Sequence, residues 1–342
     1  MRIFLPLVFL VVMASCGTQE GSHHFSSVHI ETLYTDSIGI RAIELMPGSL
    51  AFAANRGIFG SVDLQSGEVR TNTQQYDSIT PAFRSVAHTA TDFFMLSVGN
   101  PALLYKTGDQ GRMELVYTEE GEGVFYDSMT FWNDNEGIAL GDSREGCLSI
   151  LITRDGGTRW KKTPCSELPE VPEGEGAFAA SNTNIEVVGD MTYLVTTSST
   201  IYISEDKGAS WKVVKTPIVA DAPTQGIYSI DFYNADLGVV FGGDYTDPDN
   251  AKANKAITKD GGRSWHLIAD GETPGYKSCV QFVPHAGGND IVALGFTGIS
   301  YSKDMGKTWE TLSEESFYTI RFLNDSTAYA AGRGRIAKLT FK

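Results

Sequence analysis

The chain has 342 residues, including 36 glycines and 12 prolines, and 42% of its residues are hydrophobic. This composition is apolar enough for a sizeable core and excludes a wholly disordered chain. The formal charge of −15 repels phosphate, so binding of nucleic acid by charge is excluded. The high glycine content indicates many tight turns and argues against a mostly helical protein.

The first residues have the pattern of an export signal. Arg2 precedes an apolar run over residues 3–14, which is too short to span a bilayer. The sequence Met13-Ala14-Ser15-Cys16 resembles a bacterial lipobox, in which the signal is cut before the cysteine and the thiol is lipidated. An ordinary signal peptide with a chance cysteine is the alternative. We expect a signal peptide over 1–15, a lipidated Cys16 with a polar tether over 16–27, and one domain over 28–342.

Three cysteines remain beyond the tether. Cys147 and Cys165 each lie nine residues from a turn predicted near Gly156. They would face each other across two strands, so either a disulfide in an oxidising compartment or two free buried thiols is consistent with their spacing. Cys279 lies in an apolar strand and is expected to be a small core residue.

One pattern, [ST]-x-D-x-G-x-[STR]-W, repeats along the chain, and we call it the box motif. Asp and Ser/Thr side chains can pair with turn backbone groups, glycine allows positive φ, and tryptophan can begin the return strand with a buried ring. A copy with Asp109 has Glu114 in place of the tryptophan, and a fainter one lies at Asp63. The complete copies contain Asp155 and Trp160, Asp206 and Trp211, Asp260 and Trp265, and Asp304 and Trp309.

The spacing of the motif predicts the architecture. Its aspartates recur about every 48 residues, the length of one four-stranded propeller blade. We therefore predict an all-β, seven-bladed β-propeller of four-stranded blades. The last blade lacks a fourth strand before Lys342, while Val28 to Thr35 is a spare alternating strand. We expect this N-terminal strand to complete the last blade and close the ring.

The box motif resembles the Asp-box, or BNR, repeat of sialidase-like β-propellers, in which the box is a folding element away from the active site. The whole pattern is similar to the photosystem II stability/assembly factor propellers, and most similar to exported Bacteroidetes-type lipoproteins loosely labelled "oxidoreductase". No flavin, nicotinamide, haem or quinone motif supports that label, so no cofactor is expected. Stretches that carry the likeness include Ile40 to Ala42, Gly174 to Thr183, Gly275 to Val280 and Gly332 to Leu339.

A propeller places its functional loops and the starts of its inner strands on the face opposite the box turns. Three long irregular segments belong to that upper face: Ser166 to Gly176, Thr216 to Gln225 and Gly242 to Asn254. Residues predicted to form a ligand-binding rim around the channel are Arg41, Arg84, Tyr126, Asp127, Phe178, Tyr228, Lys277 and Tyr318. Arginine with tyrosine suits a carboxylate or an acidic peptide, although strand-end charges are also commonly just solvated.

Other chemistry is weakly indicated. Asp244, Asp247 and Asp249 could hold Ca²⁺, but Pro248 interrupts them and a solvated acidic loop is favoured, so no metal is expected. No catalytic residue is assigned. The alternative function is a glycoside hydrolase of sialidase type, but Phe83-Arg84-Ser85-Val86 lacks part of the arginine context of those enzymes. We expect a monomeric binding, scaffold or assembly-factor-like module in the bacterial cell envelope. It would face the periplasm or the exterior, contact the membrane through its lipid only, and bind a protein or an acidic ligand.

Overall fold

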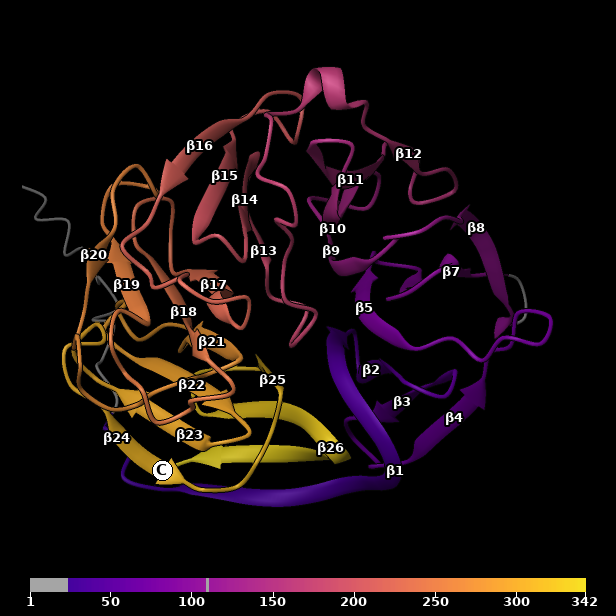
Figure 1. Cartoon of the computed structure of the whole chain (residues 1–342). Helices are drawn as coiled ribbons and strands as arrows, with labels where there is room; N and C mark the ends of the chain where they lie inside the picture. Colours follow the sequence, from indigo (N-terminus) through magenta and orange to yellow (C-terminus); the bar gives the residue numbers. More distant parts are fainter. Residues whose placement is uncertain (1–23, 109–110) are drawn as a thin grey trace, which may run out of the picture.

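The computed structural model describes residues 24–108 and 111–342 and shows antiparallel sheets arranged in a ring (Figure 1). Signal residues 1–15, Cys16 and Asp109 therefore lie outside the described residues. Five sheets have four strands each. Their strands are β5–β8 (Phe83–His88, Phe93–Ser97, Ala102–Thr107, Met113–Glu119), β9–β12 (Tyr126–Phe131, Gly137–Arg144, Cys147–Thr153, Lys161–Lys162), β13–β16 (Ile185–Val188, Met191–Val195, Thr200–Ser204, Lys212–Lys215), β17–β20 (Gln225–Phe232, Gly238–Asp244, Lys255–Thr258, His266–Leu267) and β21–β24 (Cys279–Phe282, Ile291–Gly295, Gly298–Ser302, Glu310–Ser313).

The sixth sheet has six strands in the order β25-β26-β1-β2-β3-β4. These strands are β25 (Thr319–Phe322), β26 (Thr327–Phe341), β1 (Val28–Met46), β2 (Ser49–Ala54), β3 (Ile58–Asp63) and β4 (Val69–Thr73). A 3₁₀ turn, η2, covers Cys165–Glu167. No helix in the described part of the chain is both long and apolar enough to cross a membrane.

The prediction of seven four-stranded blades is wrong, because the ring consists of six sheets. The physical reason is the length of β1 and β26. The first half of β1 pairs with β26, from Val28 opposite Phe341 to Thr35 opposite Arg335, and its second half pairs with β2. Register shifts along β1 let it bend without losing its partners, so one sheet continues where we expected a boundary between two blades.

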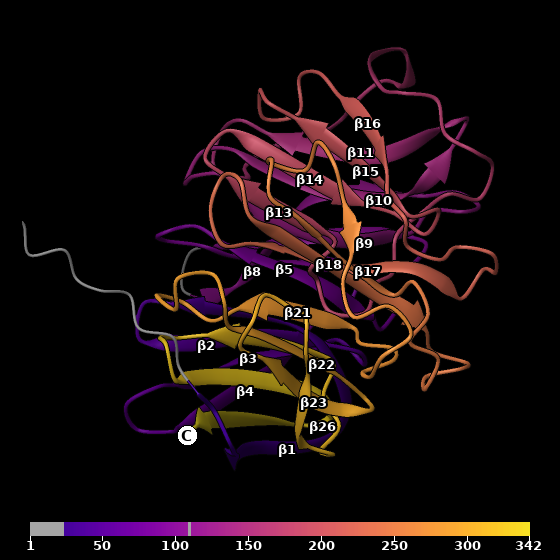
Figure 2. The same cartoon turned by 90° about the vertical axis from the view of Figure 1, so that its left-hand side faces the viewer.

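The expected pairing of Val28 to Thr35 with the C-terminal strand is confirmed. The C-terminus lies beside the start of β1 (Figure 2). Ser26 N–H donates to the carbonyl of Lys342 at 2.7 Å, and the Phe25 ring packs 5.2 Å from that of Phe341. The two ends of the described chain therefore close the ring together.

The core lies between neighbouring sheets. Phe94 in β6 is fully buried and contacts Phe131 of β9 and Trp160, whose ring centroids lie 4.7 and 6.4 Å away. Sheets covered on both faces need apolar side chains on both faces of a strand, which explains why every residue of β6 and β22 is buried. Cys279 is a fully buried free thiol in such a strand, as predicted.

The four complete box motifs form turns between the third and fourth strands of their sheets. In the copy at residues 258–265, the Thr258 hydroxyl donates to Asp260 Oδ1 at 2.8 Å and accepts the N–H of Gly262 at 2.9 Å. Asp260 in turn accepts the N–H and hydroxyl of Ser264, and these hydrogen bonds lower its pKa to about 2. The box aspartate is therefore fully used within its own turn.

Thr258→Ala is expected to lower the free energy of unfolding by about 1–3 kcal/mol, since it leaves the buried N–H of Gly262 unpaired. Urea denaturation followed by tryptophan fluorescence measures the change. Thr258→Ser keeps the hydroxyl and should be close to wild type. Equal losses in the two variants would mean that the threonine methyl, and not the hydroxyl, stabilises the turn.

A disulfide joins Cys147, at the start of β11, to Cys165, just after β12, with their Cα atoms 5.5 Å apart. Of the two arrangements that the sequence left open, the structure has the bonded one. The bond fixes the loop that leads from β12 toward the upper face.

Candidate ligand-binding site

The centre of the ring is filled by the chain itself. Residues 177–184, which we call the plug, follow β12 and precede β13 in the sequence. They cross the channel. Ser181 donates to the carbonyl of Ser278 at 2.6 Å, Asn182 donates to the carbonyl of Val86 at 2.8 Å, and Thr319 donates to the carbonyl of Ser181 at 2.9 Å. Because the plug bonds to several inner strands, it forms a fixed floor beneath the upper opening.

Two hollows lie above this floor on the upper face. The first, of about 770 Å³, is lined by residues of the bend in β1, the start of β5 and the bend in β26. The second, of about 710 Å³, extends over the plug. Arg41, Arg84, Arg333 and Tyr318 line both hollows, so the two form one site with a shared centre.

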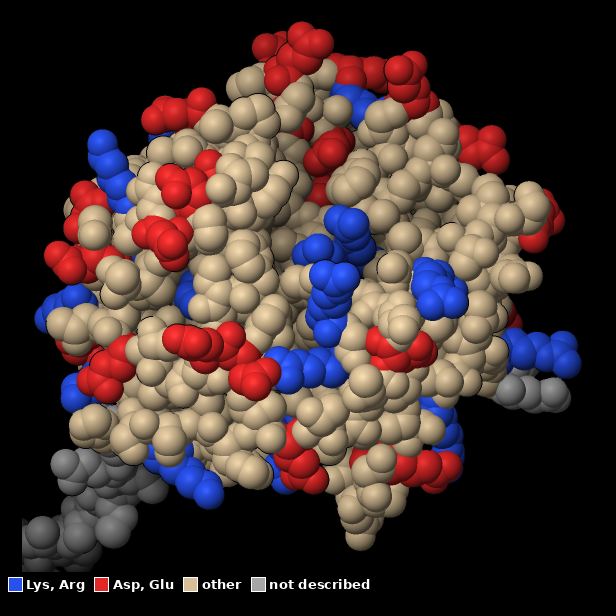
Figure 3. Space-filling model, turned by 60° about the horizontal axis from the view of Figure 1, so that its bottom comes forward, with Lys and Arg blue, Asp and Glu red and all other residues tan. Residues whose placement is uncertain are grey.

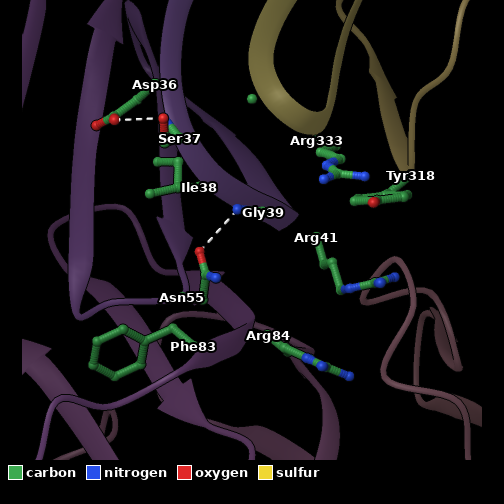
Figure 4. A pocket seen from close by; sticks show the side chains of 11 residues that line it. Asp36, Ser37, Ile38, Gly39, Arg41, Asn55, Phe83, Arg84, Tyr318 and Arg333 are labelled. Carbon is green, nitrogen blue, oxygen red and sulfur yellow. Dashed lines mark hydrogen bonds between the residues drawn. The ribbon is translucent and has the colours of Figure 1, made fainter.

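The three arginines line this shared centre, and Lys and Arg side chains gather in the middle of this face, with acidic and other basic side chains toward its edge (Figure 3). Figure 4 shows the side chains of Arg41, Arg84, Arg333 and Tyr318 extending to the same side of the first hollow. Arg41 lies over the Tyr318 ring at 4.2 Å and donates to the carbonyl of Ala180 in the plug at 3.5 Å. These two contacts fix the orientation of the Arg41 guanidinium group and leave its other N–H donors available to a ligand.

The three arginines form no ion pair within the described part of the chain. No ion pair joins any of the three to a described carboxylate, whereas Arg335 nearby is paired with Glu315 at 2.7 Å. Burial lowers the pKa of Arg84, and the positive charge of Arg41 lowers it further. Three arginines that gather at one place without an ion pair to a described carboxylate favour an anionic ligand.

The second hollow has an aromatic wall, which consists of Phe178, Tyr228, Tyr245, Tyr276 and Phe296. Phe178 of the plug stacks on Tyr228 of β17 with ring centroids 3.7 Å apart, and Tyr276 meets Tyr228 edge-on at 4.8 Å. The Tyr228 hydroxyl donates to the carbonyl of Thr224 at 2.7 Å and fixes the ring. The wall is therefore rigid where it meets the plug.

A pair of carboxyl groups lies beside the plug. Asp127 is fully buried, and neither of its carboxylate oxygens has a hydrogen-bond partner within the described residues; the nearby Asp142 lines the second hollow. Asp142 also accepts the N–H of Ala177 at 3.2 Å, and a Cβ at Gly176 would collide with its carboxylate. Burial raises the pKa of Asp142 to about 6. Burial also raises the pKa of Asp127 well above its usual range, and the negative charge of Asp142 raises it further. Two carboxyl groups so close to each other oppose each other's ionisation.

Asp142→Asn is expected to raise the free energy of unfolding by about 2 kcal/mol at pH 7.5 and to give no such gain at pH 4. The pKa of Asp142 is raised in the folded state, so its contribution is fully present below the ordinary value near 4 and is lost as the pH rises through about 6. Chemical denaturation of both proteins from pH 4 to 7.5 measures this. An equal difference across that range would show that the carboxyl does not titrate as described.

The structure brings together five of the eight predicted rim residues and places the other three elsewhere. Arg41, Arg84, Phe178, Tyr228 and Tyr318 line the site. Tyr126 is buried between sheets and donates to Glu119 at 2.6 Å, and Asp127 lies below the surface. Lys277 is 2% exposed, and its Nζ donates to the carbonyl of Gly298 at 2.9 Å and to Thr297 Oγ1 at 3.1 Å. The Lys277 ammonium group therefore donates to neighbouring groups of the protein, and it does not join the arginines at the rim.

The acidic loop after β18 uses its side chains locally. Asp244 Oδ1 accepts the N–H of Thr246 at 2.8 Å and its hydroxyl at 2.6 Å, and Asp247 accepts from Asn250 at 3.1 Å. Within residues 24–108 and 111–342, no group of three His, Cys, Asp or Glu side chains is arranged to hold a metal ion.

Sequence reasoning missed Arg333, the carboxyl pair and most of the aromatic wall. Arg333 lies opposite Gly39 where β26 bends, and not at the start of an inner strand. Tyr245, Tyr276 and Phe296 come from loops between strands, so no strand periodicity marks them. One available signal was Gly332-Arg333-Gly334, in which an arginine lies between two glycines after an apolar run.

The fold and this site define the class of protein, a β-propeller, and comparison with solved structures supports the fold. RRP9 WD40 repeats match with a TM-score of 0.66 and 10% identity over 92% of this chain and 97% of that one. YCF48 bound to D1 peptide matches with a TM-score of 0.63 and 13% identity over 94% and 97% of the two chains. YCF48 from Cyanidioschyzon merolae matches with a TM-score of 0.62 and 13% identity over 92% of this chain and 98% of that one.

Sequence comparison is less extensive. The Sortilin-Vps10 family model (sortilin, neurotensin receptor 3) matches residues 148–280, which is less than half of the chain. No curated protein matches this chain. The similarities therefore identify a β-propeller whose structural neighbours include WD40 repeats and YCF48.

Proposed function

We propose that this protein is an exported, lipid-anchored β-propeller of the Asp-box type that binds a protein partner in the bacterial cell envelope. The observation that carries the proposal is the convergence of Arg41, Arg84 and Arg333, unpaired with any described carboxylate, around one hollow. The partner would present a carboxylate-bearing segment, which guanidinium groups bind with charge-assisted hydrogen bonds. The pattern of residues 1–16 supports export and lipidation at Cys16.

A scaffold or assembly-factor-like role is consistent with the neighbours. YCF48 has been solved with a D1 peptide, and the same fold in this chain would hold its own partner on its upper face. The rigid ring and the plug fix the arginines before binding, so little ordering is needed when the partner arrives. The partner's chemistry follows from the site and not from the neighbour.

A random 12-residue peptide library displayed on phage tests the proposal. We expect acidic peptides to be selected by the wild-type protein, and their synthetic versions to bind at least tenfold more weakly to Arg41→Ala/Arg84→Ala/Arg333→Ala. The control Arg70→Ala/Arg159→Ala/Arg263→Ala removes the same charge from exposed residues at other turns and edges. Equal binding by the two triple variants would refute the proposal.

A steric variant provides a second test without removing any charge. Gly39 lines the first hollow, and a Cβ added there would meet no atom within 4 Å. Gly39→Phe should therefore fold and block the peptide, while Gly99→Phe, at the other glycine with open space and an ordinary φ, should not. The sialidase-type alternative predicts turnover of a fluorogenic sialoside by the purified protein.

A further inference from the structure

The aromatic wall has an unusual degree of exposure. Tyr245 is 48% exposed and Phe296 is 40% exposed, and they are the two aromatic residues among the exposed large hydrophobic side chains of the described chain. Both meet Tyr276, at centroid distances of 6.5 and 5.3 Å, and so extend the wall away from the plug. Exposed aromatic side chains gathered at one hollow mark a binding surface.

The wall is continuous with the arginine site. Arg41, Arg84, Arg333 and Tyr318 line both hollows, so a ligand bound by the guanidinium groups also reaches the rings. A third hollow shares Asp36, Arg333 and Gly334 with the first and leads outward past Glu315. The three together form an elongated groove from the edge of the ring to the aromatic wall, which suits an extended chain more than a compact small molecule.

We propose that the aromatic wall is the specificity subsite of this groove: it takes one large apolar side chain of an extended peptide whose carboxylate lies on the arginines. This inference rests on the proposed function of the arginine site. The charge of the arginines selects the acidic group, and the apolar face beside them selects its neighbour. Acidic peptides without such a side chain would leave Tyr245 and Phe296 in water.

Synthetic peptides derived from the selected sequences test the inference by fluorescence anisotropy with the full chain. Replacing the large apolar residue by alanine should weaken binding about tenfold for the wild-type protein. Tyr245→Ala/Phe296→Ala should weaken binding of the apolar peptide to a similar extent and change binding of its alanine version by less than threefold. Leu115→Ala/Leu323→Ala removes two exposed apolar side chains elsewhere and should have no effect.

The outcomes separate the two proposals. Selection of acidic peptides without a large apolar neighbour, with affinity unchanged by Tyr245→Ala/Phe296→Ala, would overturn the aromatic subsite and leave the arginine site standing. Selection of peptides without acidic residues would overturn both. Tyr245→Ala and Phe296→Ala alter exposed side chains, and circular dichroism of the double variant shows whether it is folded before its binding is interpreted.

Discussion

A chain that begins at residue 36 is expected to lose cooperative folding, whereas one that begins at residue 24 should fold as the full protein does. The deletion removes the strand half that pairs Val28 with Phe341 and Ile30 with Leu339, and leaves a long open edge on β26. It also removes Phe25, which is 4% exposed and packs 5.0 Å from the ring of Tyr301. The lost burial and pairing are of the order of the whole stability of a domain, about 5–15 kcal/mol.

Circular dichroism with urea titration of the two chains measures this effect. Phe25→Ala in the longer chain provides an intermediate case, with an expected loss of about 3–4 kcal/mol. An unchanged urea midpoint in the chain starting at residue 36 would mean that the ring is held closed by the other sheets, and that the β1–β26 pairing adds little.

Lys277→Ala is expected to lower the free energy of unfolding by about 3 kcal/mol or more, because it empties a buried site and leaves carbonyl oxygens without a donor. The Nζ atom now donates to Gly298 and Thr297, and the residue is 2% exposed. Peptide binding by the folded fraction should remain within twofold of wild type. If Lys277→Ala instead weakened peptide binding without lowering the stability, Lys277 would belong to the ligand-binding rim.

The same residue gives the protein a distinct pH dependence. Burial lowers the pKa of Lys277 to about 8, so between pH 8 and 10 the unfolded chain holds more protons and stability rises with pH. Lys277→Met keeps the aliphatic stem and lacks this titration. Comparison of the two proteins by chemical denaturation at pH 7.5 and 9.5 isolates the contribution of the ammonium group. Parallel changes in both would assign the pH dependence to other groups.

The sequence predicts the local turns of this molecule better than the number of its sheets. The box turns depend on hydrogen bonds within about six residues, as between Thr258, Asp260 and Gly262, so the spacing alone specifies them. Blade number depends on where long strands bend. β1 continues across the expected boundary from β26 to β2, and nothing in an alternating pattern marks where one sheet ends.

The candidate site was predicted in part for a similar reason. Arg41 and Arg84 were predicted because they lie at the starts of inner-strand segments, and the sequence shows the position of a residue along a strand. Whether a side chain then points to the rim or into the core depends on three-dimensional packing, which buries Lys277 against the turn at Thr297 and exposes Arg333 at a bend. The plug overlaps the stretch Gly174 to Thr183 that carries the family likeness, but its position in the channel could not be predicted, since its partners are distant in sequence.

The position of β1 determines how this ring would respond to a mechanical load. A pull applied through the N-terminal segment reaches the hydrogen bonds between β1 and β26 first, together with the contact between Ser26 and Lys342. Because β1 continues without interruption to Met46, the force is passed on to β2 and shared across a six-stranded sheet. The strand that closes the ring is therefore also the one that would carry the strain of a tethered protein.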